Sequence, residues 1–243
     1  MKKIIILICF LSVIVLFTNC NKKKSTEPEE ATDTMTGNDG KTYKIVKIGN
    51  QVWMAENLRE TQYRNGNPIP NVTSNSEWAY LSTGAYCAYD NSESNAETYG
   101  YLYNWYAVND SRNIASEGWH TPTDVEWKEL EMYLGMSQSG ADDTGFRGTN
   151  EGSKLAGNAS LWDSGDLKNN SAFGTSGFSA LPGGYRYHYS GGFNDLGSYA
   201  FFWASTEFCS SIAWYRCLNF NYSEVARDYF NMQRGFSVRL VRD

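Results

Sequence analysis

The chain has 243 residues, of which 41% are hydrophobic, 15% aromatic and 20% charged, a composition typical of a globular protein rather than a disordered one. Lys and Arg total 21 against 27 Asp and Glu, and the formal charge of −6 argues against a nucleic-acid-binding protein. The only histidines are His120 and His188, which excludes a three-histidine metal site within one chain.

The first 19 residues have the pattern of a bacterial lipoprotein signal peptide. Two lysines precede residues 4–17, a 14-residue stretch that is apolar except for one serine. This stretch suits a signal peptide and is shorter than the ~20 apolar residues of a membrane-spanning helix. Residues 16–20, Leu-Phe-Thr-Asn-Cys, resemble the lipobox, in which cleavage occurs before a cysteine that carries diacylglycerol. We therefore expect removal of residues 1–19 and lipidation of Cys20, the alternative being a plain secretory signal.

The next segment, residues 20–36, reads as a tether behind the lipidated cysteine. It is dominated by charged residues, Ser, Thr and Pro, and Met35 is its only large apolar residue. Two or more acyl chains on Cys20 would give stable anchoring. We expect an exported protein that is lipid-anchored at a bacterial membrane, at the outer membrane or cell surface, with membrane lipid as a partner and no nucleic acid.

Residues 37–243 contain no second low-complexity stretch and no fixed-period repeat, so a single domain is expected. Both of its ends carry strand signals. Residues 42–48 and 51–55 flank a Gly-Asn pair in which Gly49 can supply the positive backbone angle of a tight hairpin turn. Residues 236–241 alternate apolar and other side chains from Phe236 onward, the pattern of a half-buried strand.

One helix is clearly marked in the middle of the chain. Thr123 and Glu126 have the spacing of a capping box, so each can accept a hydrogen bond from a free amide at the helix start, and Gly135 is placed to end the helix. The face expected to be buried comprises Trp127, Leu130, Glu131 and Leu134. Residues 135–176 are rich in Gly, Asn and Ser, which predicts long packed loops anchored by scattered aromatic and aliphatic residues.

An ordered series of motifs runs through the expected domain. These are GKTY at 40–43, IGNQVWMAENL at 48–58, YCAYDN at 86–91, YGYLYNW at 99–105, GWHTPT at 118–123, GFSALPGGYR at 177–186, FWAST at 202–206 and GFSVRLVRD at 235–243. In this order they resemble the Fibrobacter succinogenes major paralogous domain, a module of bacterial secreted proteins and lipoproteins. The resemblance implies an α+β, C-type-lectin-like fold, in the variant of the formylglycine-generating enzymes. Such a fold has mixed sheets, few helices, long ordered loops, and the N- and C-terminal strands in one sheet. The family has no settled activity, so the resemblance implies no function.

Three cysteines follow the expected tether. Cys209 and Cys217 lie eight residues apart and are the candidate disulfide, because exported proteins meet oxidants. The resemblance to formylglycine-generating enzymes leaves an alternative, in which this pair binds copper and oxidises a substrate cysteine. Family members often carry a partner for Cys87 near Asn95, where this chain has none, so we expect Cys87 to be buried and free.

The sequence gives little support for a metal site or for a catalytic histidine. Acidic and amide side chains at 90–97 and 142–143 offer oxygen ligands for Ca²⁺, yet the EF-hand pattern and the Glu-Pro-Asn sugar motif of calcium-dependent lectins are absent. We expect solvated acidic loops and predict no cofactor, with calcium and copper as alternatives. His120 is expected to be a buried, hydrogen-bonded residue that fixes its loop. No Gly-x-Ser-x-Gly elbow is present.

The segment at 183–192 is the candidate ligand-binding region. Tyr185, Tyr187 and Tyr189 fall on one side of an extended segment, and Arg186 and His188 fall on the other. Tyrosine rings can stack on sugar faces or pack in the core, while Arg and His add polar contacts. We expect Tyr187 to face the core, and Arg186 and His188 to face outward as part of the binding surface.

These observations favour a cell-envelope lipoprotein that displays a non-catalytic binding or adhesion domain. Its ligand would be an extracellular polymer such as polysaccharide, or a partner protein. The first alternative is an oxidase similar to the formylglycine-generating enzymes. The second is a structural component of a surface complex.

Overall fold

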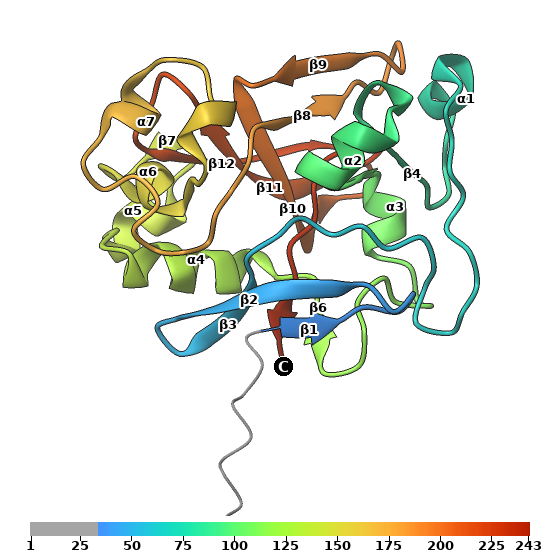
Figure 1. The fold of residues 1–243 in the computed structure, drawn as a ribbon, viewed down its shortest axis with the longest axis horizontal. Coiled ribbons are helices and arrows are strands. Elements are labelled where there is room, and N and C mark those ends of the chain that lie inside the picture. The colour runs from blue at the N-terminus through green and yellow to red at the C-terminus, as the bar shows by residue number, and fades with distance from the viewer. Residues whose placement is uncertain (1–33) are drawn as a thin grey trace, which may run out of the picture. The chain divides into compact units, whose positions relative to one another are not determined.

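Three β-sheets organise the part of the chain that the structure describes, residues 34–243 of a computed structural model (Figure 1). The strands are β1 (Thr34–Thr36), β2 (Thr42–Ile48), β3 (Gln51–Met54), β4 (Tyr86–Cys87), β5 (Leu102–Tyr103), β6 (Trp119–His120), β7 (Gly145–Arg147), β8 (Gly183–Arg186), β9 (Phe193–Leu196), β10 (Tyr199–Cys209), β11 (Ile212–Asn219), β12 (Val225–Asn231) and β13 (Val241–Arg242). The helices are α1 (Asn75–Ala79), α2 (Glu93–Tyr99), α3 (Trp105–Val108), α4 (Asp124–Tyr133), α5 (Gln138–Asp142), α6 (Glu151–Leu155) and α7 (Asp166–Asn169), with 3₁₀ turns η1 (Tyr89–Asn91) and η2 (Ala159–Leu161).

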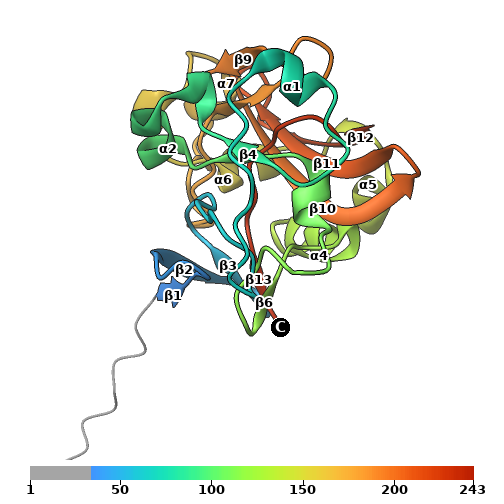
Figure 2. The ribbon, with the colours of Figure 1, turned by 90° about the vertical axis from the view of Figure 1, so that its right-hand side faces the viewer.

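A five-stranded sheet of order β1-β2-β3-β13-β6 and a six-stranded sheet of order β7-β12-β11-β10-β8-β9 form the framework, and β4 and β5 pair separately. β8 and β10 run parallel, while the other pairs within the six-stranded sheet are antiparallel, so this sheet is mixed. Figure 2 shows the long strands β10 and β11 side by side, ending in a hairpin at the edge of the domain. The domain is α+β with few helices, and β13 joins the N-terminal strands in one sheet, as the C-type-lectin-like resemblance implied.

The predicted N-terminal hairpin is confirmed as β2 and β3, and Gly49 in its turn has a φ of +62°. A Cβ atom at Gly49 would lie 2.7 Å from the ring of Tyr133, so both the turn and the packing require glycine. Strand β1 lies within the expected tether and pairs with β2, burying Met35 opposite Tyr43. Strand β1 therefore places regular structure inside the segment expected to be tether, a correction to the expected boundary at residue 36.

The C-terminal segment is buried on both faces rather than half-buried. Phe236, Ser237, Val238, Arg239, Leu240 and Val241 are all at most 2% exposed. The segment threads between the two large sheets: Trp203 N donates to Ser237 O (3.2 Å), and Leu58 N donates to Val238 O (2.9 Å). Segments distant in sequence thus pair with both of its edges. Its two faces are buried because Phe236, Val238 and Leu240 pack in one core cluster and Arg239 lies over the rings of Phe178 and Phe202 in the other, which alternation within the segment cannot reveal.

Helix α4 begins at the predicted capping box, in which Thr123 and Glu126 bond reciprocally. Trp127 packs between the sheets, with ring-centroid distances of 4.9 Å to Trp53 and 5.9 Å to Phe202. The predicted buried face is confirmed for Trp127, Leu130 and Glu131, and Leu134 is half-buried. Helix α4 therefore ties the five-stranded sheet to the six-stranded one.

A buried ionic network fixes α4 to the six-stranded sheet. Glu131 accepts hydrogen bonds from Arg216 Nε and Arg147 Nη2, each at 2.6 Å, and Asp124 accepts from Arg216 Nη1 at 2.8 Å. Arg227 binds both carboxylate oxygens of Asp124 through Nε and Nη2 at 2.9 and 2.8 Å. Burial would raise the pKa of Asp124, but these two arginines outweigh it and lower the pKa to about 2.

The middle segment, residues 135–176, contains α5, β7, α6 and α7 rather than loops alone. Leu155 and Trp162 are buried anchors, as expected. Phe146 is 40% exposed and stacks on Tyr222 instead of entering the core. Of these short helices only α5 has a side-chain cap, in which Ser137 accepts from Gly140 N, and no long apolar period announces any of the three.

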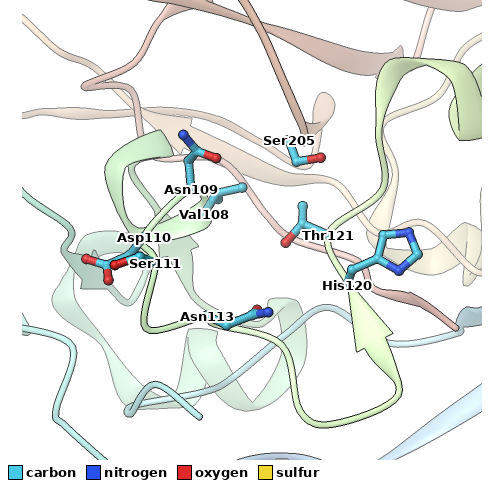
Figure 3. A pocket seen from close by; sticks show the side chains of 8 residues that line it. All are labelled: Val108, Asn109, Asp110, Ser111, Asn113, His120, Thr121 and Ser205. Carbon is cyan, nitrogen blue, oxygen red and sulfur yellow. The ribbon is translucent and has the colours of Figure 1, made fainter. Parts of the chain in front are cut away.

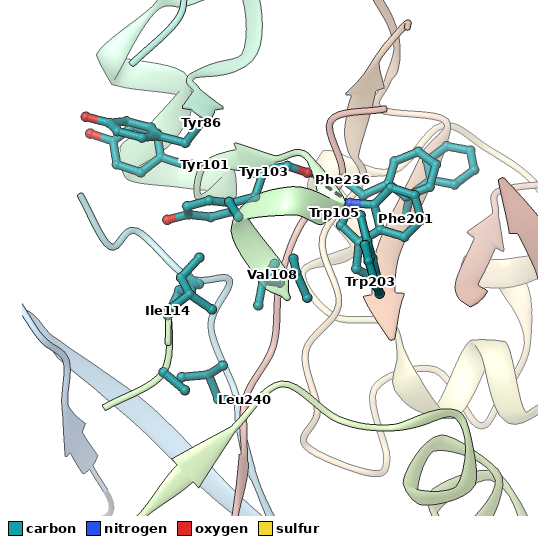
Figure 4. Packing of buried hydrophobic residues seen from close by; sticks show 14 of the residues in the cluster. Tyr86, Tyr101, Tyr103, Trp105, Val108, Ile114, Phe201, Trp203, Phe236 and Leu240 are labelled. Atoms are coloured by element: carbon teal, nitrogen blue, oxygen red, sulfur yellow. Dashed lines mark hydrogen bonds between the residues drawn. The ribbon is translucent and has the colours of Figure 1, made fainter. Parts of the chain in front are cut away.

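An aromatic cluster fills the core between the small β4–β5 sheet and the C-terminal segment (Figure 4). Trp203 Nε1 donates to Tyr103 O (2.9 Å) and Trp105 Nε1 donates to Ala204 O (2.9 Å), so the buried indoles are satisfied. Phe236 packs against Trp203 at 4.4 Å. This cluster supports one side of β10 and so positions the site described next.

Candidate functional site

Arg186, a predicted outward ligand residue, is 0% exposed and belongs to the core. Its guanidinium donates to Gly191 O (2.8 Å), Thr73 O (3.0 Å), Asn75 Oδ1 (3.0 Å) and Val72 O. It also lies over the Trp78 ring at 4.5 Å and the Phe193 ring at 4.8 Å. The outward assignment is wrong because Arg186 supplies donors to loop carbonyls that the sheets leave unpaired.

His188 is also buried, at 5% exposure, whereas Tyr189 is 76% exposed and Tyr185 and Tyr187 are half-buried. The predicted faces are therefore inverted: the tyrosine side is the more accessible one. Burial, together with the charge of Arg234, lowers the pKa of His188, so a neutral ring is favoured. The period-2 pattern separated the two faces correctly and could not tell which one was inside.

A pocket of about 350 Å³ opens beside Tyr185 on one face of the six-stranded sheet. Its lining residues are Gly145, Phe146, Tyr185, Asp195, Tyr199, Phe201, Tyr215, Cys217, Ala226, Asp228, Phe230 and Arg234. We call it the aromatic pocket. Alternate residues of β10, β11 and β12 project to the same face, which explains why these three strands supply most of its walls.

The hollow arises where two small side chains oppose each other between aromatic rings. Cys217 on β11 pairs with Ala226 on β12, and both are buried. Around them stand Phe201, which stacks on Tyr199 with a centroid distance of 5.5 Å and an interplanar angle of 9°, and Tyr185, 5.2 Å from Phe201. Rings on either side of such a small pair leave a cavity with apolar walls.

Three charged residues line the aromatic pocket: Asp195, Asp228 and Arg234. Arg234 is 8% exposed, and its Nε has no hydrogen-bond partner among residues 34–243. Its guanidinium carbon lies 3.3 Å from the ring centroid of Phe230 and 4.8 Å from that of Tyr185, and burial lowers its pKa. Asp195 has a left-handed φ of 63°, and burial raises its pKa.

Exposed aromatic side chains continue from the pocket in two directions. Phe146 and Tyr222, 40% and 45% exposed, stack at 4.4 Å on the β7 side. On the β8 side Tyr187 contacts Tyr189 at 5.6 Å, and both rings follow Tyr185 along the chain. We call these four residues the aromatic rim. The rim extends the apolar surface beyond the pocket itself.

A second pocket, of about 330 Å³, is polar (Figure 3). It is lined by Val108, Asn109, Asp110, Ser111, Asn113, His120, Thr121 and Ser205. Asp110 is bound to Arg112 through both carboxylate oxygens, at 2.8 and 2.7 Å. The Thr121 hydroxyl is buried and has no partner within the described residues. Neutral hydroxyl and amide groups therefore remain the free polar groups of this pocket.

His120 is hydrogen-bonded and fixes its loop, as the sequence predicts, but its side chain is 32% exposed, whereas a buried histidine was expected. Its Nδ1 lies 2.6 Å from Asp243 Oδ1 and its Nε2 lies 2.6 Å from Glu126 Oε1. Burial alone would lower the pKa of His120, but the hydrogen bonds to Asp243 and Glu126 raise it overall. With both ring nitrogens engaged, His120 joins β6, α4 and the C-terminus.

Cys87, Cys209 and Cys217 are all free, and the predicted disulfide between Cys209 and Cys217 is wrong. Cys209 pairs with Ile212 across the hairpin, whereas Cys217 pairs with Phe201. The five residue steps from Ile212 to Cys217 span ~17 Å of strand, well beyond the ~7 Å between Cα atoms that a disulfide allows. Cysteines near the ends of one antiparallel hairpin can share a short sequence interval and still lie far apart.

The candidate calcium residues are engaged locally or spread along the surface. Glu93 Oε2 accepts from Tyr101, and Asp142 accepts from Lys128 and Gln138. Within residues 34–243 no three His, Cys, Asp or Glu side chains gather closely enough to hold a metal ion. The expected lipidation site, Cys20, and the signal peptide lie outside the described residues.

The sequence of residues 46–242 matches the Fibrobacter succinogenes major domain. The chain belongs to this family. No curated protein and no solved structure matches it. In this Fibrobacter succinogenes major domain, helices of the described part are all too short or too polar to cross a membrane.

Sequence reasoning found one pocket residue, Tyr185, and missed Tyr199, Phe230, Asp195 and Arg234. Tyr199 and Phe201 alternate at the start of β10, and Asp228 and Phe230 alternate in β12. That alternation was a readable signal for one face of each strand. The order of the strands in the sheet could not be predicted from the sequence, so the residues that form the pocket could not be brought together.

Proposed function

We propose that this domain is a non-catalytic binding module that holds an extended polysaccharide chain in the aromatic pocket. The observation that carries the proposal is the pocket itself, in which half-buried Tyr185, Tyr199 and Phe230 stand beside Asp195 and Arg234. Sugar rings present apolar C–H faces that pack on aromatic rings, and hydroxyl edges that bond carboxylates and guanidinium groups. A volume of about 350 Å³ is within the range of small-molecule sites.

The aromatic rim supports a chain rather than a chain end as the ligand. Phe146 and Tyr222 lie beside the pocket on one side, and Tyr187 and Tyr189 lie on the other. A polymer seated in the pocket can therefore contact apolar surface with the units before and after the buried one. Solvent-exposed aromatic surface of this kind is typical of recognition sites.

The anchoring part of the proposal rests on the sequence. We propose that Cys20 is acylated and that the following tether presents the domain at the outer membrane or cell surface. Cys20→Ala should release the protein from the membrane fraction and remove the acyl mass from the mature N-terminus. Unchanged membrane fractionation of Cys20→Ala, with no acyl mass on the wild-type N-terminus, would refute it.

Binding is tested by affinity electrophoresis of the full chain against a panel of neutral and acidic polysaccharides. Tyr199→Ala and Tyr185→Ala should abolish the retardation that wild type shows, because each removes a wall of the pocket. Tyr80→Ala is the matched control, since Tyr80 is 87% exposed and lies outside the pocket. Equal retardation of all three variants, or no retardation of wild type by any polysaccharide, contradicts the proposal.

The oxidase alternative is not favoured by the positions of the thiols. Copper oxidation by a cysteine pair needs both sulfur atoms at one metal. Cys209 lies at the exposed hairpin end, and Cys217 lies in the pocket floor beside Ala226. A binding role does not require that either thiol be reactive or that the two lie close together.

A further inference from the structure

Arg234 differs from the other buried arginines of this domain in having no carboxylate or carbonyl partner for its guanidinium within the described residues. Arg147 also lacks a partner for its Nε there, but its Nη atoms donate to Val225 O and to Glu131. Arg216 binds two carboxylates, and Arg239 donates to Asn57 Oδ1 and to the carbonyls of Met54, Phe178 and Ser179. Arg186 is satisfied by four oxygens, as described above. Within residues 34–243, Arg234 Nε has no hydrogen-bond partner and no carboxylate forms an ion pair with the guanidinium, which interacts instead with the hydroxyl of Tyr185.

The position of Arg234 is fixed by its neighbours and is directed to the pocket. Its backbone closes a turn in which Arg234 N donates to Asn231 O (3.0 Å), directly after β12. The next residue, Gly235, has no room for a Cβ atom, which would lie 2.9 Å from the Cβ of Arg186. The guanidinium carbon then lies 3.3 Å from the ring centroid of Phe230, 4.8 Å from that of Tyr185 and 5.0 Å from that of Tyr187.

A nearly buried guanidinium that has no carboxylate partner and no acceptor for its Nε is costly, because hydration is lost and the ring contacts replace only part of it. A planar, two-oxygen anion suits its paired donors best. We propose that the aromatic pocket selects a polysaccharide of uronic acid units, with the carboxylate of one unit bound by Arg234. This inference rests on the proposed polysaccharide-binding function and names the substrate class of the same pocket.

The two aspartates of the pocket fit a monoanionic sugar acid. Asp195 and Asp228 are more exposed than Arg234, so water screens their charges while it is excluded from the guanidinium. Their carboxylates can accept hydrogen bonds from sugar hydroxyls on the edge away from Arg234. Hydroxyls at one end and a single carboxylate at the other describe a uronic acid.

The experiment compares polyuronates with the same polymers after esterification. Oligomers of galacturonate, glucuronate and mannuronate, and their methyl esters, are titrated into the full chain by calorimetry. Methyl esters keep the ring, the linkage and the hydroxyls and remove only the charge. Wild type should bind at least one oligouronate, and its methyl ester should bind at least about 30-fold more weakly, the loss expected for a buried charge pair.

Variants of Arg234 provide the second arm. Arg234→Gln should weaken binding of the preferred oligouronate to the level of the methyl ester and leave binding of the ester itself unchanged. Arg242→Gln, at an exposed residue outside the pocket, removes the same charge and should change neither value. If Arg234→Gln fails to fold, the wild-type affinities for the oligouronate and for its methyl ester still test whether the carboxylate is recognised.

Two results would overturn the inference, and they differ in what else they affect. Equal wild-type affinity for an oligouronate and its ester, or binding of neutral polysaccharides alone, refutes carboxylate recognition and leaves the proposed function standing. No binding of any polysaccharide, neutral or acidic, refutes both.

Discussion

Arginine is the residue on which the interior of this domain most depends. Arg186, Arg216 and Arg239 are all 0% exposed. Arg239 has four oxygen acceptors, none of them a carboxylate, and burial lowers its pKa to about 9. A domain of short elements has many loop carbonyls that no strand or helix pairs, and the five donors of a guanidinium can satisfy several of them at once.

Replacing Arg186 should therefore be severe. Arg186→Ala leaves the carbonyls of Val72 and Gly191 without donors and removes contacts with Trp78, so unfolding free energy should fall by about 3 kcal/mol or more. Tyr189→Ala, three residues away and 76% exposed, should change it by no more than ~0.5 kcal/mol. Urea denaturation measures both, and equal small effects would contradict the burial of Arg186.

Glu60 should make the stability of the domain depend on pH. It is 0% exposed and accepts from Tyr43 and from the Asp39 amide, each at 3.0 Å. Burial, and then the charge of Asp39, raises its pKa to about 7 from an ordinary value near 4.5. A raised pKa means that the folded state holds this proton more tightly. The resulting stabilisation is complete below about pH 4.5 and is lost as pH rises through about 7.

Glu60→Gln cannot ionise and provides the comparison. Between pH 4.5 and pH 8 the unfolding free energy of wild type should fall relative to Glu60→Gln, by up to roughly 3 kcal/mol. The measurement is urea unfolding of both proteins at several pH values. Parallel pH profiles for the two proteins would show that Glu60 does not titrate with a raised pKa.

At the scale of elements, local signals predicted the β2–β3 hairpin and α4, because a turn and a capping box are read from adjacent residues. The C-terminal segment was predicted as a half-buried strand and is buried on both faces. Its second face is covered by the rings of Phe178 and Phe202, over which Arg239 lies, and no local pattern connects them to it. The inversion of Arg186 and His188 has the same origin, since alternation divides two faces without naming the inner one.

The ionic network beneath α4 gives the element-scale prediction. Asp124→Asn removes the charge that faces Arg216 and Arg227, leaving both buried guanidinium groups underpaired. Breaking such a pair costs about 3 to 5 kcal/mol. Because the pKa of Asp124 is lowered to about 2, its stabilisation is present above an ordinary value near 3.8 and is lost as pH falls through about 2.

The control for Asp124→Asn is Glu129→Gln, an exposed residue of the same helix. At pH 7 only the Asp124 variant should lose several kcal/mol in urea denaturation. The difference in unfolding free energy between wild type and Asp124→Asn should become smaller toward pH 2. A difference in unfolding free energy that stays constant with pH would mean that Asp124 stabilises the domain through packing and not through its charge.

At the scale of the whole molecule, the site depends on strand order. Tyr185 was predicted from its own segment, but the pocket exists because Cys217 lies opposite Ala226 and because β8 lies parallel to β10. Arg234 lies three residues after the end of β12 at Asn231, and no sequence pattern singled it out. Its importance comes from burial among rings of Phe230, Tyr185 and Tyr187, which is a property of tertiary packing.

The arrangement of the three thiols yields the last prediction. Burial raises the pKa of Cys87 to about 12 and raises that of Cys217 as well, so neither forms a thiolate readily. Cys209 is exposed at the β10–β11 hairpin, beside Phe208. Only the exposed thiol can react while the domain is folded.

Alkylation of the native protein, followed by peptide mapping, should modify Cys209 alone, and denaturation should make Cys87 and Cys217 reactive. In an oxidising buffer the exposed thiol can pair only between molecules, so wild type should form a covalent dimer that Cys209→Ser does not. A peptide linking Cys209 to Cys217 would contradict the hairpin register, and with it the pocket floor that this register builds.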